Sequence, residues 1–180
     1  MKPKFFFTAI LILLMTSAYS QTYKNETNSD DQKQLVEKEL VSAQILTNLG
    51  VGTAQNDRNA TLRGNSVVLS QIGDYNTAAI NVVAQASEIN INQVGDQNYV
   101  GLDYKVKTAI SEILQEGNRN TVYDIVNNSD ADISLDIQQQ GNDLNFQRLG
   151  VNKLTESLQF KQTEASPVLI IRSDSFGFVN

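Results

Sequence analysis

The sequence predicts an all-β protein made of stacked strand–turn–strand repeats, a β-solenoid-like stack with a short N-terminal helical or disordered segment. Two observations predict this fold. A six-residue pattern recurs at a fixed spacing, and the residues on both sides of each copy alternate between apolar and polar. Alternation with a period of two is typical of a strand with one buried face, and self-similarity at periods of roughly 20–50 residues is typical of repeat architectures.

The recurring pattern is Gln, any residue, Gly, two residues, Asn. The same spacing of 22 residues separates Gln71 from Gln93 and Gln93 from Gln115. The fourth copy keeps Gln139, with its Asn one place late, and the fifth copy keeps Gln but has Glu164 in place of Gly and Pro167 in place of Asn. The ladder and turn residues predicted from these copies are Gln71, Gly73, Asn76, Gln93, Gly95, Asn98, Gln115, Gly117, Asn120, Gln139, Gly141, Asn145 and Gln162.

The flanks of each copy predict which side chains face the interior. Counting back from each Gln in steps of two gives mainly apolar residues, with Ser111 as an exception in the third copy. Beyond the turn the alternation resumes, but the third copy meets Asp124, so we expect its second strand to be irregular. The expected interior positions are Val67, Leu69, Ile89, Ile91, Ile113, Ile133, Leu135, Ile137, Leu158 and Phe160 before the turns, and Ala78, Ile80, Val82, Val100, Leu102, Val122, Leu169 and Ile171 after them.

Stacking follows because a unit of two strands is too small to bury its own apolar face. Five rungs at roughly 4.8 Å each would make a stack of about 24 Å. Glutamine and asparagine amides carry both donors and an acceptor, so identical amides in register can bond along the stack as ladders. In the turns we expect Gly to adopt a positive φ, and Asp74, Asp96 and Asn118 to bond their own backbone.

The remaining chain divides into a signal, a leader and a tail. Residues 1–20 read as a secretory signal peptide, with Lys2 and Lys4 before an apolar run and small residues preceding a cleavage site after Ser20. Residues 21–64 form a leader that is partly disordered, the repeats cover 65–171, and 172–180 is a tail. Apolar residues at helical spacing over 34–49 predict a short amphipathic helix that caps the stack or docks on a secretion partner, with a solvated leader as the alternative.

Composition excludes several function classes. The chain has no Cys and no His and a formal net charge of −6. Without Cys or His most zinc sites and common nucleophile–base pairs are excluded, and an acidic chain without a basic cluster is a poor partner for nucleic acid. We therefore expect no catalytic residue, no cofactor, no metal and no small-molecule substrate.

The repeats resemble the curlin repeat, in which Ser, five residues, Gln, one residue, Gly, two residues, Asn, one residue and Ala recur about every 22 residues. Ser87 precedes Gln93 at the family spacing, and Asn76-Thr77-Ala78 matches the Asn-x-Ala element. The resemblance covers roughly 65–171. It implies a secreted, extracellular subunit of cell-surface curli fibres, which bacteria make for biofilm matrix, adhesion and cell aggregation.

The resemblance also implies partners: other curlin subunits, and the curli secretion and chaperone machinery. The eroded fourth and fifth copies favour a minor, nucleating role over that of the major subunit. We expect polymerisation by edge-to-edge templating, with charges in the turns and Pro167 limiting indiscriminate pairing. The rivals are a monomeric secreted repeat adhesin and a secreted enzyme carried on a β-helix.

Overall fold

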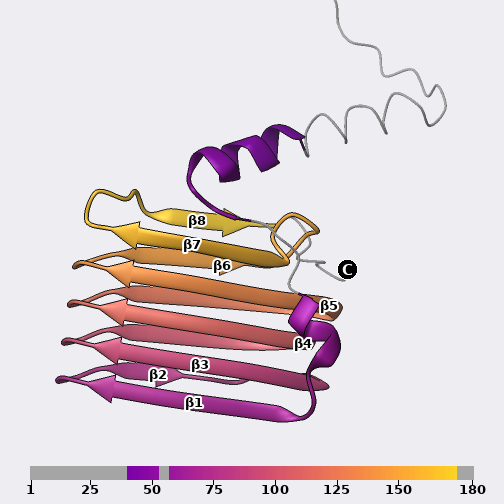
Figure 1. Cartoon of the computed structure of the whole chain (residues 1–180), viewed down its shortest axis with the longest axis horizontal. Helices are drawn as coiled ribbons and strands as arrows, with labels where there is room; N and C mark the ends of the chain where they lie inside the picture. Colours follow the sequence, from indigo (N-terminus) through magenta and orange to yellow (C-terminus); the bar gives the residue numbers. More distant parts are fainter. Residues whose placement is uncertain (1–39, 53–56, 174–180) are drawn as a thin grey trace, which may run out of the picture.

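The structure, a computed structural model, describes residues 40–52 and 57–173 and confirms the predicted fold class. Its strands stack as a parallel β-solenoid of about five turns (Figure 1). The expected signal peptide, the first part of the expected helix and most of the expected tail lie outside the described residues. The strands are β1 (Asn65–Ile72), β2 (Thr77–Ala79), β3 (Ala86–Val94), β4 (Tyr99–Glu116), β5 (Thr121–Gln140), β6 (Asn145–Leu149), β7 (Ser157–Thr163) and β8 (Leu169–Arg172).

All strand pairs are parallel, and they form two faces of the stack. One face, here called the glutamine sheet, contains β1, β3, residues 108–116 of β4, residues 132–140 of β5, and β7. The other face, the second sheet, contains β2, residues 99–106 of β4, residues 121–128 of β5, β6 and β8. The strands β4 and β5 are long because each bends from the second sheet into the glutamine sheet.

Each turn of the solenoid is called a rung. Rung 1 is β1 with β2, and rung 2 is β3 with the first half of β4. Rung 3 is the second half of β4 with the first half of β5. Rung 4 is the second half of β5 with β6, and rung 5 is β7 with β8. The core lies between the two sheets, where the alternating apolar residues of both faces meet, as the period-two pattern predicts.

The two-residue difference in spacing between the third and fourth repeats is absorbed at one corner. Val106 pairs with Asn128 and Thr108 pairs with Asp132, so one residue on β4 faces three on β5. Register is kept on both sides of this irregularity. An insertion at the corner therefore leaves every inward side chain of the neighbouring strands on the inward face.

Two short helical segments accompany the stack within the described residues. A 3₁₀ helix, η1 (Asp57–Thr61), lies against the flank of β4 and β5, where Asn59 Nδ2 donates to Thr108 Oγ1 (2.9 Å) and to the carbonyl of Ile133 (3.0 Å). An α-helix over 40–48 lies beyond β7 and β8, at the opposite end of the stack from β1 (Figure 1). Among the described residues, none of the helices has the length and apolarity needed to cross a bilayer.

Candidate functional site

Five glutamines form a continuous column inside the glutamine sheet. The register places Gln71, Gln93, Gln115, Gln139 and Gln162 directly over one another. The Nε2 of each of the first four donates to the Oε1 of the glutamine on the next rung, at 2.6 Å for the first pair and 2.8 Å for the other three. The second Nε2 proton of the last four goes to a backbone carbonyl, such as Thr121 O for Gln139 (3.0 Å).

The asparagine column works differently from the expected amide ladder. Asn98 Nδ2 donates to the carbonyl of Gly117 (2.8 Å), and Asn98 Oδ1 accepts from the backbone N–H of Asn120 (3.0 Å). Asn76 and Asn120 make the same kind of contact with the next rung. The expectation of bonds between identical Asn amides is therefore wrong, because the turn places backbone groups, rather than a second amide, within reach of each Asn side chain.

Asn145 does not belong to the asparagine column. It pairs with Thr121, whereas the position above Asn120 is held by Leu144, whose N–H donates to Asn120 Oδ1 (3.1 Å). The assignment of Asn145 to the ladder was wrong. The fourth copy keeps the spacing of the other copies but has Leu144, and no Asn, at the ladder position. The Oδ1 of Asn145 is buried without a hydrogen-bond partner.

The turns repeat one conformation in rungs 1 to 4. Gly73, Gly95, Gly117 and Gly141 all have positive φ, between 109° and 142°. The residue two places after each Gly also has positive φ, near 57°, although it is Tyr, Gln, Arg or Asp. A Cβ on the first three glycines would overlap the carbonyl oxygen of the glycine one rung on, so close stacking as well as φ selects Gly there.

The turn carboxylates and amides bond between rungs. The N–H of Asp74 donates to Asp96 Oδ1 (2.8 Å), and the N–H of Asp96 donates to Asn118 Oδ1 (2.8 Å). The side chains of Asp96 and Asn118 were expected to bond their own backbone. They instead bond the backbone of the preceding rung, because a parallel stack holds equivalent turns one strand spacing apart.

Rung 5 departs from this turn. Ser166, the residue two places after Glu164, lacks the positive φ of its equivalents, and its Oγ accepts from the N–H of Thr163 (2.9 Å). Glu164 Oε1 accepts from Asn142 Nδ2 (3.1 Å), so its side chain faces rung 4. The turn of rung 5 therefore presents a different set of donors and acceptors from the turn of rung 1.

A buried ionic cluster replaces apolar residues in the second sheet. Asp124 and Arg148 are adjacent in register and both are fully buried. Arg148 Nε donates to Asp124 Oδ1 (2.7 Å), Arg148 Nη2 donates to Asp124 Oδ2 (2.6 Å), and Arg148 Nη1 donates to the carbonyl of Thr155 (2.8 Å). The Tyr104 hydroxyl donates to Asp124 and lies 3.3 Å from Ser111 Oγ.

This cluster explains an irregularity that the sequence showed. Asp124 sits on the regular inward face of β5, so the expectation that the second strand of the third copy is irregular is wrong. Burial raises the pKa of the Tyr104 hydroxyl well above its ordinary value, and Asp124 raises it further against the opposing effect of Arg148. Sequence reasoning missed Arg148; the signal was its position 24 residues after Asp124, the same separation as Gln115 to Gln139.

The two ends of the stack are unequal. In rung 1, Val67 and Leu69 face inward but are 50% and 45% exposed, whereas their partners Ile89 and Ile91 are 0% and 2% exposed. In rung 5, Leu158 is 1% exposed, because residues 40–52 cover it from outside the stack. Within the described chain, rung 1 is therefore an open end and rung 5 a covered one.

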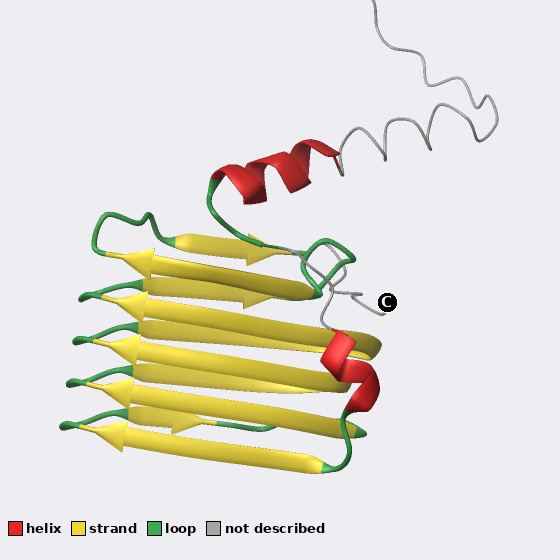
Figure 2. Ribbon diagram, viewed as in Figure 1, coloured by secondary structure: helices red, strands yellow, loops and turns green. Residues whose placement is uncertain are grey.

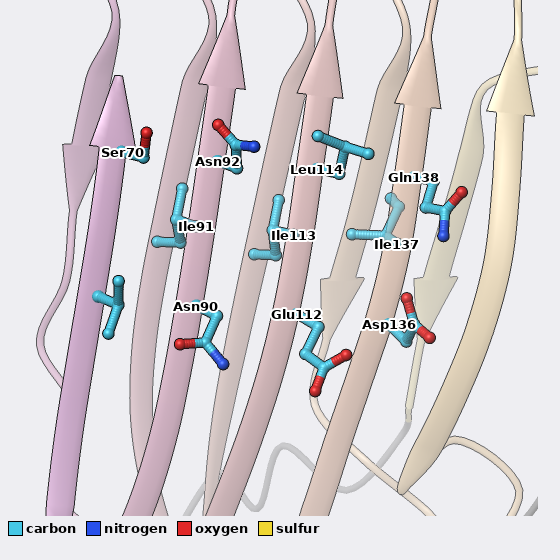
Figure 3. A pocket seen from close by; sticks show the side chains of 11 residues that line it. Ser70, Asn90, Ile91, Asn92, Glu112, Ile113, Leu114, Asp136, Ile137 and Gln138 are labelled. Atoms are coloured by element: carbon cyan, nitrogen blue, oxygen red, sulfur yellow. The ribbon is translucent and has the colours of Figure 1, made fainter. Parts of the chain in front are cut away.

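The outer face of the glutamine sheet carries an open groove of about 530 Å³. Rows of outward side chains line it, among them Ser70, Asn92, Leu114 and Gln138 (Figure 3). Its two carboxylates are already engaged: Glu112 pairs with Arg58, and Asp136 accepts from Gln159 (2.8 Å). In residues 40–52 and 57–173, no cluster of three acidic side chains is placed to hold a metal ion.

Comparison with known proteins finds no match for this chain among family models, curated proteins or solved structures. The geometry of the stack is therefore the basis for assigning a function. Its most distinctive surface is the open rung 1, where an apolar interior meets a strand edge with which no described strand pairs.

Proposed function

We propose that this chain is a secreted structural subunit of curli-like extracellular fibres, which adds copies edge to edge by β-templating. The observation that carries the proposal is the open rung 1, whose inward Val67 and Leu69 are about half exposed. An unpaired strand with an apolar face is a template for another strand. The role is in biofilm matrix, adhesion and cell aggregation, as a minor or nucleating subunit.

The columns support templating because they repeat the same contacts from rung to rung. The Oε1 of Gln71 is the acceptor that the Nε2 of a further glutamine would reach, since every later pair has this polarity. A neutral amide is donor and acceptor at once, so the column has no natural end. A second copy adding a rung beneath β1 would extend the column and bury the exposed apolar residues.

The proposed partners are further copies of this chain, other curlin subunits, and the curli secretion and chaperone machinery. These partners and the extracellular location rest on the repeat resemblance and on the expected signal peptide. Assembly itself is testable without them. Purified chain from residue 21 onward should form fibres that bind thioflavin and diffract at roughly 4.7 and 10 Å. A chain that stays monomeric for days, with or without fibre seeds, would overturn the proposal.

A matched pair of variants tests the open end directly. Leu69→Lys places a charge on the inward face of β1, where a second copy would bury it. Val68→Lys places the same charge on the outward face of the same strand. Because burying an unpaired ammonium is costly, we expect Leu69→Lys to slow fibre elongation more than tenfold and Val68→Lys to leave it near the wild-type rate. Equal rates would show that growth does not use rung 1.

A monomeric secreted adhesin is the second candidate. The covered rung 5 favours it, because a fibre subunit needs two available ends. A hydrodynamic size that stays constant with concentration and time would select this candidate.

A further inference from the structure

Residues 40–52 fold into a compact plug whose shape is set at the end of the helix. Gly50 has a positive φ of 74°, and the N–H groups of Gly50 and Val51 donate to the carbonyls of Thr47 (3.0 Å) and Leu46 (2.9 Å). These bonds form the Schellman motif, which brings the residue after the glycine against the last turn of the helix. Leu46 and Val51 thus lie together, and both join the core cluster of the stack.

The plug is attached to the stack by a short antiparallel pairing. The N–H of Gly52 donates to the carbonyl of Gln159 (2.7 Å), and the N–H of Gln159 donates to the carbonyl of Gly52 (2.9 Å). Gln159 lies on β7, which pairs with β5 on its other side. The plug therefore uses backbone groups of β7 that a sixth rung would otherwise pair with.

The plug lies where that sixth rung would stack. Figure 2 shows the helix beyond the last strands at one end, while no described segment lies beyond β1 at the other. Leu46 is 9% and Val51 2% exposed, so both side chains fill the open interior of rung 5. The equivalent interior of rung 1 has no such filling among the described residues, which is why Val67 and Leu69 remain exposed.

The contact that holds the plug is small. The neighbouring apolar side chains of the helix, Val41, Ile45 and Leu49, are about half exposed and contribute little. The plug pairs with β7 through the single residue pair Gly52 and Gln159. One residue pair and two apolar side chains therefore compete against a complete rung, which would pair along all of β7.

We propose that residues 40–52 are a displaceable intramolecular plug, which holds the rung 5 end closed until rung 1 of a second copy replaces it. This inference rests on the proposed function and adds a regulatory step to it: the fibre grows at the rung 5 end only after the plug has left β7. The segment that replaces the plug is rung 1 of a second copy, because its inward residues match those of rung 5. Val67, Leu69 and Gln71 have the same spacing as Leu158, Phe160 and Gln162, so the glutamine column would continue across the junction.

A reversible disulfide tests the plug, because the chain itself has no cysteine. A Cβ on Gly52 would lie 3.7 Å from the Cβ of Gln159, which suits a disulfide. In the double variant Gly52→Cys/Gln159→Cys, oxidation locks the plug and reduction releases it. The wild-type chain, treated with the same oxidant and reductant, controls for their direct effects on growth.

We expect the oxidised variant to elongate seeds at least tenfold more slowly than the same protein after reduction. Equal rates in both states would overturn the plug and leave the proposed function intact. If the reduced variant and the wild type both fail to grow, and the opened variant described next fails as well, the proposed function and the plug are overturned together.

A second variant opens the plug without a disulfide. Leu46→Asp/Val51→Asp places two charges in the interior of rung 5, which should expel residues 40–52 and leave the stack folded. We expect a lag time shortened severalfold. Ile45→Asp, on an exposed position of the same helix, should not change the lag. An unchanged lag in the double variant, with hydrogen exchange showing that the Gln159 amide is no longer protected, would overturn the plug.

Discussion

The glutamine sheet and the second sheet both bury polar side chains, but the first pairs identical neutral amides and the second pairs opposite charges. One column of the glutamine sheet holds the same amide in all five rungs. The matching column of the second sheet reads Leu102, Asp124, Arg148 and Ile171 over four rungs. A column of neutral amides can be extended by any number of rungs. A buried ion pair needs one cation and one anion on adjacent rungs, so the same residue cannot repeat along its column. The glutamine sheet is therefore the extendable half of each rung, and the second sheet carries what is particular to this chain.

The largest expected effect comes from breaking the ion pair. Arg148→Met leaves the fully buried Asp124 without its cation, and we expect a loss of about 3–5 kcal/mol in the free energy of unfolding. Urea denaturation of the monomer measures it. The double variant Asp124→Leu/Arg148→Leu, which restores an apolar column, should lose less than the single variant. A greater loss in the double variant would show that the pair stabilises the stack beyond cancelling its own burial.

Breaking the amide column should lower the free energy of unfolding by less than breaking the ion pair does. Gln115→Leu keeps the volume but leaves the Oε1 of Gln139 and the carbonyl of Tyr99 without a donor, for an expected loss of about 1–3 kcal/mol. Gln138→Leu changes an adjacent, exposed glutamine and serves as the control in the same denaturation series. If both variants unfold at the same urea concentration, the column adds no stability.

The ionic cluster should also make the stack sensitive to alkali. Because the pKa of Tyr104 is raised in the fold, its contribution to stability is present below the ordinary tyrosine pKa of about 10 and is lost as the pH rises above that value. Tyr104→Phe should lower stability at pH 7 by about 1 kcal/mol and flatten the loss above pH 10. Thermal unfolding between pH 7 and 11.5 compares the two chains, and parallel curves would contradict the assignment.

The smallest expected effect is a gain. Asn145 has a buried, unpartnered Oδ1, and its register partner in rung 3 is Thr121. Asn145→Thr should replace the unsatisfied carbonyl oxygen with a hydroxyl that can donate as well as accept, as at Thr121, and raise stability by about 0.5–1 kcal/mol. The melting temperature measures this gain, and Asn142→Thr, which removes the inter-rung hydrogen bonds to the Asn118 N–H and to Glu164, should lower it instead. A lower melting temperature for Asn145→Thr would mean that the amide has a partner in solution.

Sequence reasoning predicted what repeats and missed what does not. The spacing of Gln71, Gln93 and Gln115 was enough to predict the rungs, because residues one repeat apart occupy equivalent positions on successive turns of a solenoid. Asn145 was misplaced because the nearest Asn was chosen over the register position. Arg148 was missed because charges were assumed to face outward, and nothing in the sequence relates Gly52 to Gln159. Contacts that occur once, between segments far apart in sequence, have no periodicity to reveal them.

The irregular corner at residues 129–131 bears on how such a chain changes length over evolutionary time. Extra residues there bulge away while the strands on both sides keep their pairing, so small insertions and deletions are tolerated at a corner. One residue gained within a strand would instead turn its inward side chains outward and be lost to selection. Genes for this architecture should therefore vary by whole repeats or by a few codons at corners. The corner is also the position at which a foreign peptide could be displayed on the stack.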